Sequence, residues 1–236
     1  MCTVSFVCTN DKVIITSNRD EKIIRPSAIP PKNYTRNGKN IIYPKDSKAG
    51  GTWYAVDENG TILVLLNGAD EKHEVKLPYR KSRGQIVLEI IGNASPREFW
   101  EEIDLDNIEP FTLVLFQEKR LFQLRWNEIE KSTINLDIGK NYVWSSSTLY
   151  SKEIREQRSS WFYTFLDKNP EITEEKMLHF HQYTERDNKE HGLVINRNNE
   201  MKTLSITQSV IEKNKVVIHH LDLITDKEYS KTFISI

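Results

Sequence analysis

The first 21 residues constrain the fold of this chain most strongly, because they predict a β-hairpin that begins almost at residue 1. Thr3 to Cys8 is short, apolar and rich in β-branched residues, and Lys12 to Ser17 has the same strand-like character. The polar pair Asn10-Asp11 between them suits a tight turn. Because the two arms are nearly equal in length, the hairpin returns residues 18–21, with the sequence Asn-Arg-Asp-Glu, to the neighbourhood of Cys2.

Cys2 becomes an N-terminal cysteine once Met1 is removed, and cysteine is small enough for that removal. The freed α-amine has a pKa of ~7.7–8.0 and the thiol one of ~8.5, so both exchange protons near neutral pH. One residue then carries a nucleophile and a general base. A nearby cation such as Arg19 would lower the thiol pKa further. The alternative is a small apolar packing residue, and the returning Asn-Arg-Asp-Glu segment favours the chemical interpretation.

Three motifs carry a family resemblance: Met-Cys at the start, Asn18-Arg19-Asp20-Glu21 after one hairpin, and Gly50-Gly51-Thr52-Trp53 before a strand pair. Together they resemble the NRDE family, whose eukaryotic members are called transport and Golgi organisation protein 2. The resemblance covers most of the chain and is sharpest in residues 1–70. That family is similar to N-terminal nucleophile (Ntn) hydrolases, including choloylglycine hydrolases and penicillin V acylase. It implies a single α+β domain over residues 1–236, a four-layer αββα sandwich of two antiparallel sheets, and cleavage of a non-peptide amide.

The resemblance also implies roles for individual residues. The Cys2 thiol would attack an amide or thioester carbonyl while its α-amine acts as base and then as acid. Asp20 would orient the amine, and Arg19 would favour the thiolate or pair with Asp20; a buried Arg19–Asp20 pair without a catalytic task is the alternative. Asn67 follows the apolar strand Ile62–Leu66, at the place of an asparagine that supplies the oxyanion hole in choloylglycine-like enzymes. Asn67 can equally be the turn residue that ends this strand.

Four further residues are candidate binding positions, namely Asn18, Glu21, Trp53 and Ser146. Ser146 stands where the family has a Ser-Asn-Ser type motif, so the asparagine of that motif is absent here. Leu204 stands at the arginine of a Thr-Arg-Ser-Ser-Thr motif, so any anion-binding role of that arginine is lost or relocated. These departures favour a second hypothesis, a non-enzymatic carrier of haem, acyl-CoA or a lipid on the same scaffold.

The resemblance implies a small-molecule partner with an amide, acyl or haem-like character, and the composition argues against other classes of partner. The net charge is −1 and the basic residues are dispersed, which argues against nucleic-acid binding. No apolar run approaches the ~18 residues that a membrane span needs, and the N-terminus lacks a secretory pattern. The two cysteines, Cys2 and Cys8, indicate a reducing compartment, so we expect a cytoplasmic protein. On one extended strand they would lie roughly 20 Å apart, too far for a shared bridge or metal.

The histidines do not predict a metal site. His179 and His181 are two residues apart on a predicted helix, and His219 and His220 are adjacent on a predicted strand, so neither pair can chelate one ion. We therefore expect no metal, and no cofactor except haem or acyl-CoA as the ligand of a carrier.

Three local expectations concern the rest of the chain. Residues 25–50 are rich in proline, asparagine and lysine and predict a long surface loop, which is either a functional lid or binding loop or a plain connection. Gly192–Ile195 predicts a short strand. Arg83, in a Ser-Arg-Gly motif that the family shares, is interpreted as a solvated residue at the start of a helix rather than as an anion-binding group.

Overall fold

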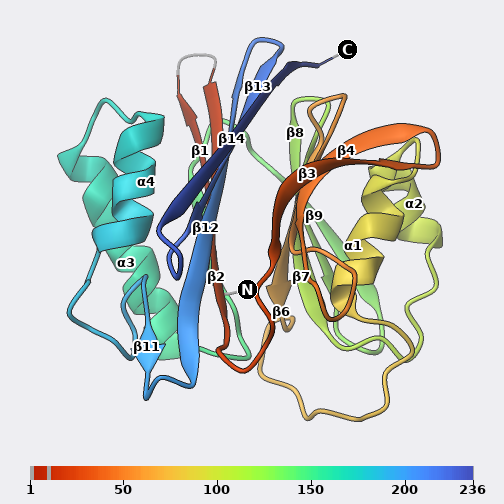
Figure 1. Ribbon diagram of the computed structural model, residues 1–236, viewed down its shortest axis with the longest axis horizontal. Coiled ribbons are helices and arrows are strands. Elements are labelled where there is room, and N and C mark those ends of the chain that lie inside the picture. Colours follow the sequence, from red (N-terminus) through yellow and green to blue (C-terminus); the bar gives the residue numbers. More distant parts are fainter. Residues whose placement is uncertain (1–2, 10–11, 236) are drawn as a thin grey trace. The chain divides into compact units, whose positions relative to one another are not determined.

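The computed structural model describes residues 3–9 and 12–235. Their contacts divide the chain into two compact units (Figure 1). The first unit is built from both ends of the chain, up to Arg25 and from Gly139 to Phe233, and the second from Pro26–Ile138 with the last residues. Each unit has one antiparallel sheet and two helices, which confirms the predicted α+β class. The single domain over residues 1–236 stays a prediction.

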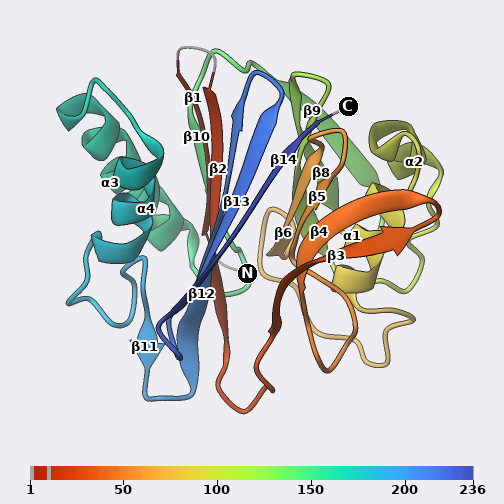
Figure 2. The ribbon, with the colours of Figure 1, turned by 45° about the horizontal axis from the view of Figure 1, so that its top comes forward.

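The sheet of the first unit has the strand order β10-β1-β2-β12-β13-β14, with β11 paired to β12. The N-terminal hairpin therefore lies between two strands from far along the sequence, as Figure 2 shows. The strands are β1 (Thr3–Thr9), β2 (Lys12–Lys22), β10 (Tyr142–Ser145), β11 (Asn196–Arg197), β12 (Met201–Glu212), β13 (Lys215–Asp222) and β14 (Lys227–Ile234).

Two helices, α3 (Lys152–Lys168) and α4 (Glu174–Tyr183), cover one face of this sheet (Figure 1). The N-cap of α4 is Thr173, whose side chain accepts a hydrogen bond from the backbone of the third helical residue. The core between helices and sheet joins strand residues to helix aromatics, and burying each such side chain contributes about 1.5–3 kcal/mol. Its fully packed members are Val7, Ile14, Phe162, Met177, Phe180, Leu193 and Val210.

The sheet of the second unit has the order β3-β4-β5-β6-β7-β8-β9, so every strand pairs with its neighbour in sequence. Helices α1 (Arg83–Ile91) and α2 (Pro96–Glu102) pack on it through β5, β6 and β7. The predicted apolar strand is β6, and its residues 62–66 are all buried. The strands are β3 (Ile29–Arg36), β4 (Lys39–Lys45), β5 (Tyr54–Asp57), β6 (Ile62–Asn67), β7 (Phe111–Gln117), β8 (Arg120–Trp126) and β9 (Lys131–Leu136).

The predicted loop at residues 25–50 is instead the β3–β4 hairpin, which runs across to α1 (Figures 1 and 2). Its prolines misled the prediction: Pro30 and Pro31 lie in the edge strand, at a register irregularity where a missing N–H is tolerated. Asn37-Gly38 forms the hairpin turn with positive φ at both residues. Lys39, just after the turn, is buried and pairs with Asp57 at 2.5 Å.

The Gly-Gly-Thr-Trp and Ser-Arg-Gly motifs meet backbone to backbone in the second unit. A Cβ on Gly51 would lie 2.3 Å from the Gly84 carbonyl carbon, and one on Gly84 would lie 2.9 Å from the Thr52 oxygen. The Thr52 N–H donates to the Gly84 carbonyl at 3.0 Å. Both glycines are therefore needed for close approach of two chain segments, which gives these motifs a packing role.

Gly192–Ile195 is not a strand, contrary to the prediction. The Gly192 carbonyl accepts a hydrogen bond from the Arg158 guanidinium, and the Leu193 carbonyl accepts one from the Asn18 side chain. Side chains from α3 and β2 thus occupy backbone acceptors that a ladder would have used. The apolar pattern that suggested a strand comes instead from Leu193, a member of the helix–sheet core.

Candidate active site

Cys2, the predicted nucleophile, lies outside the described residues. The residue bonded to it, Thr3, is described and pairs with Asn18 of β2 and Ser145 of β10. The predicted hairpin is therefore confirmed, and residues 18–21 lie beside the start of β1. They differ from the prediction in one respect: β2 continues through them to Lys22 instead of ending at Ser17.

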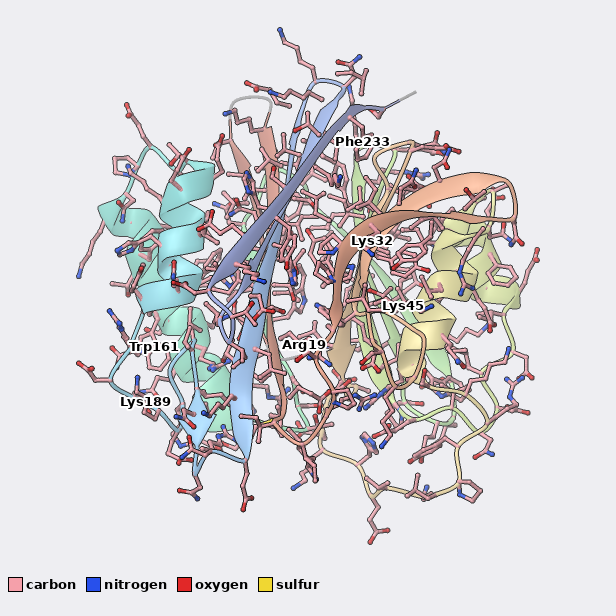
Figure 3. The ribbon with its side chains drawn as sticks, in the orientation of Figure 1. Arg19, Lys32, Lys45, Trp161, Lys189 and Phe233 are labelled. Atoms are coloured by element: carbon pink, nitrogen blue, oxygen red, sulfur yellow. The ribbon has the colours of Figure 1, made fainter. Side chains whose placement is uncertain are left out.

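Strand alternation separates the four motif residues instead of gathering them at one point. Asn18 and Asp20 point to the helix-covered face, where their partners lie on α4 and beside α3. Arg19 and Glu21 point to the opposite face. Figure 3 shows Arg19 on the side of β2 away from α3, which carries Trp161. The expected convergence on one place is thus wrong for these side chains, because the motif is extended strand and not a turn.

Asn18 belongs to a buried network with Ser5 and His181. Its amide NH2 donates to the backbone carbonyls of His181 (3.0 Å) and Leu193 (2.7 Å), so its Oδ1 is the acceptor for His181 Nδ1–H. His181 Nε2 then accepts from the Ser5 hydroxyl at 2.7 Å. Burial, with the Arg158 charge as a smaller cause, lowers the pKa of His181 to about 3, so the ring is neutral at physiological pH. Asn18 therefore fixes α4 to the N-terminal hairpin.

Asp20 is a buried carboxylate, 3% exposed, with a hydroxyl on each oxygen. The Tyr150 hydroxyl donates to Oδ2 at 2.8 Å and the Thr203 hydroxyl to Oδ1 at 2.5 Å. The pairing of β2 with β12 shifts between Thr203 and Ser205, so Leu204 is the extra residue of a bulge. Such bulges re-aim side chains, and here the irregularity keeps Thr203 facing Asp20 while Ser205 pairs with Arg19.

Arg158 of α3 is fully buried, and the sequence analysis did not identify it. Its Nη1 donates to Thr3 Oγ1 at 2.5 Å and its Nε to the His191 carbonyl at 3.0 Å. The guanidinium carbon lies 3.6 Å from the centre of the Tyr150 ring. Arg158 lies in α3 and Tyr150 just before it, and α3 is rich in charged residues. The sequence therefore offers no sign that one cation points inward. The only available signal was that position 158 falls on the same helix face as Phe162 and Trp161.

On the opposite face, Arg19 and Arg25 share one carboxylate. Each has a guanidinium nitrogen 3.6 Å from Glu21 Oε2, and the Arg19 side chain is only 4% exposed. His220 of β13 lies on this face too, since it pairs with Thr207 and hydrogen-bonds its hydroxyl at 2.8 Å. Burial lowers the pKa of His220 to about 4; Asp222 raises it, and Arg19 lowers it further. This half of the motif is therefore a positively charged face beside a neutral histidine.

Ser146 follows Ser145, the strand partner of Thr3, and is buried. Its hydroxyl lies 2.9 Å from Thr148 Oγ1, and its carbonyl accepts from the Tyr150 N–H at 3.1 Å. The residue predicted to bind ligand thus builds the turn that places Tyr150 next to Asp20.

Asn67 and Trp53 belong to the second unit. Asn67 is the last residue of β6 and pairs with Phe111; Gly68 follows with a φ of 82°, a conformation that favours glycine. The Gly68 N–H donates to the Pro110 carbonyl, which also accepts from Arg83 at 3.1 Å. Trp53 is buried, and its carbonyl accepts from the Leu65 N–H. The oxyanion role of Asn67 and the binding role of Trp53 stay predictions.

Arg83 is not the solvated residue that the sequence suggested. Its side chain is 15% exposed and pairs with Glu109 at 3.0 Å. The adjacent chain turn at residues 109–110 supplies both the carboxylate and a carbonyl acceptor, which is why the side chain folds back from the start of α1.

No group of three or more histidine, cysteine, aspartate or glutamate side chains gathers in a metal-binding arrangement within residues 3–9 and 12–235. None of the helices in that part of the chain is long and apolar enough to cross a membrane.

Comparison with known proteins places the chain in a family. The family model described as Transport and Golgi organisation 2 matches residues 1–231. The chain belongs to this family. The curated proteins include no match to this Transport and Golgi organisation 2 member.

Solved structures show which fold this family member has. An N-acylethanolamine-hydrolyzing acid amidase orthologue from Caenorhabditis elegans matches with a TM-score of 0.65 and 10% identity, over 88% of this chain and 92% of that one. The C2A mutant of the conjugated bile acid hydrolase from Clostridium perfringens matches with a TM-score of 0.50 and 12% identity, over 99% and 96%. The Transport and Golgi organisation 2 member thus has the α+β sandwich fold of these Ntn hydrolases.

Proposed function

We propose that this protein is a cysteine Ntn-type amidohydrolase or acyltransferase that acts on a small-molecule amide or thioester through Cys2. The observation that carries the proposal is the pairing of Thr3 with Asn18, which brings the Asn-Arg-Asp-Glu motif to the residue bonded to Cys2. The solved structures support it: one neighbour is named as an amidase for N-acylethanolamines and the other as a hydrolase of conjugated bile acids.

In the proposed reaction, the Cys2 sulfur attacks the carbonyl carbon and the thiol proton passes to the free α-amine. Collapse of the tetrahedral intermediate breaks the C–N bond; the ammonium returns the proton to the leaving nitrogen, and the acyl group stays on sulfur as a thioester. Water then attacks the thioester, giving its proton to the amine, and the thiol and a carboxylic acid are released. An acyltransferase differs only in the acceptor that replaces water.

Asp20 suits the role of holding the amine. Its carboxylate is buried, and both of its oxygens accept hydroxyl hydrogen bonds that fix its orientation. An ionised carboxylate stabilises a neighbouring ammonium and so raises the basicity of the amine. Arg19, on the opposite face with Glu21, is suited to favour the thiolate or to bind an anionic substrate group. Asn67 is proposed as a side-chain donor to the oxyanion.

The first test is the mass of the purified full-length protein before and after reaction with a thiol-reactive acylating probe. The proposal predicts a species that lacks Met1 and reacts faster at Cys2 than at Cys8, which lies in β1 and serves as the internal control. Cys2→Ala should abolish turnover of an N-acylethanolamine or a conjugated bile acid, while Cys8→Ser retains it. A protein that retains Met1 and labels no faster at Cys2 overturns the enzyme proposal. The carrier hypothesis is then tested by titration with haem and acyl-CoA.

A further inference from the structure

Arg158 is costly to bury, and the structure gives it no carboxylate. Among the described residues its polar contacts are two backbone carbonyls, of His191 and Gly192, and the hydroxyl of Thr3. An arginine that is 0% exposed and makes no salt bridge with a described carboxylate loses its hydration without the close ion pair that usually compensates for it. An apolar residue would join α3 to the sheet at lower cost. The cation therefore has a task other than packing.

The contacts of Arg158 lead to two groups of the proposed site. Through Nη1 it fixes the side chain of Thr3, the residue bonded to Cys2. Through its planar face it lies on the Tyr150 ring, 3.6 Å from the ring centre, and the Tyr150 hydroxyl donates to Asp20 Oδ2. A cation over a phenol ring is attracted to it and withdraws electron density, which makes the hydroxyl a stronger donor.

We propose that Arg158 and Tyr150 are positioning residues: Arg158 sets the residue next to Cys2, and Tyr150, held under the guanidinium, sets the carboxylate of Asp20. This inference rests on the proposed function, because Cys2 and Asp20 are the nucleophile and the amine-orienting group of that proposal. It adds α3, which carries no residue of the family motifs, to the parts of the fold that tune the N-terminal amine and thiol.

The cleanest perturbation is Tyr150→Phe, which deletes one oxygen and keeps the ring under Arg158. We would measure alkylation of Cys2 and of Cys8 by iodoacetamide from pH 5 to pH 9 with the full chain, resolving the two sites by peptide mass spectrometry. We expect the ratio of the Cys2 rate to the Cys8 rate at pH 7 to fall about three- to tenfold, and the midpoint of the Cys2 profile to move by about half to one pH unit. Tyr183→Phe, a tyrosine on α4 that is 39% exposed, is the matched control and should leave both quantities unchanged.

Arg158→Lys is the second variant, since it keeps the charge and loses the planar fork. It should lower the same ratio. The double variant should lower it by less than the product of the two single effects, because Arg158 acts on Asp20 through Tyr150 as well as on Thr3 directly. If Arg158→Lys does not fold, the Tyr150→Phe variant alone tests the inference.

The outcomes separate the two proposals. Wild-type protein in which Cys2 reacts no faster than Cys8 overturns the proposed function and this inference together. Wild-type protein with a fast Cys2, and a folded Tyr150→Phe variant with the same ratio and pH midpoint, overturns this inference alone. A lower melting temperature without a change in the Cys2 profile has the same meaning, because it is the signature of a purely structural role.

Discussion

Acidification should destabilise this protein through His181, whose pKa is about 3 in the folded chain against 6.5 for an ordinary histidine. Because the folded-state pKa is the lower one, the unfolded chain binds more protons between those two values. The free energy of unfolding is therefore fully retained above pH 6.5 and decreases as the pH falls towards 3. For a single group with these pKa values, the loss between pH 7.5 and pH 5 is about 2 kcal/mol, and the full loss below pH 3 approaches 5 kcal/mol.

The assay is urea unfolding at pH 7.5 and pH 5 for the wild type and for His181→Gln, which keeps a donor and an acceptor but does not titrate. The variant should be less stable than the wild type at pH 7.5. Between pH 7.5 and pH 5, however, its free energy of unfolding should decrease by about 2 kcal/mol less than that of the wild type. His179→Gln, at an exposed position on the same helix, controls for the loss of a histidine. Equal pH dependence in the wild type and both variants would refute the argument that a neutral, buried His181 links Ser5 to Asn18.

Three further changes test the fold around the motifs. Gly51→Ala should lower the free energy of unfolding by about 1–3 kcal/mol in urea titrations, because its Cβ would lie 2.3 Å from the Gly84 carbonyl carbon; a variant as stable as the wild type would contradict this. Lys39→Met should cost about 3–5 kcal/mol by leaving the Asp57 carboxylate buried and unpaired, and Lys39→Met with Asp57→Asn should recover part of that loss in the same titration. Thr203→Val should cost about 1–3 kcal/mol by removing a donor to Asp20, and a melting temperature equal to that of the wild type would contradict it.

The sequence predicts much of this fold because strand alternation, turn pairs and helix caps are local signals. The N-terminal hairpin and the apolar strand β6 both follow from residues within a few positions of one another. The β3–β4 hairpin was missed because prolines obscured its period, although Asn37-Gly38 marked the turn. Gly192–Ile195 was misassigned because its backbone acceptors serve side chains more than 30 residues away in sequence.

The site was harder to predict, for a physical reason. The Asn-Arg-Asp-Glu motif was found from its spacing, but which face each side chain takes depends on whether the segment is strand or turn. Arg158, Tyr150 and His181 reach the motif only through tertiary contacts, with 130 or more residues between hydrogen-bonded partners. The sequence shows only that position 158 is an arginine, not whether its side chain is buried or exposed. In a helix where apolar and charged residues are mixed, hydrophobic periodicity does not identify the charged residue that points inward.

The strand order of the first unit has a consequence for synthesis on the ribosome. The second unit is almost continuous in sequence, so it is complete once residue 138 has emerged. The N-terminal hairpin is synthesised first but gains its neighbouring strands late. β10 pairs with β1 and β12 pairs with β2, and β12 ends only at Glu212. Thr3 lacks its second strand partner until Ser145 has been made, and it lacks the guanidinium from α3 until Arg158 has been made. An enzyme that removes Met1 from the nascent chain, as the proposed function requires, would therefore act while both edges of the hairpin are open.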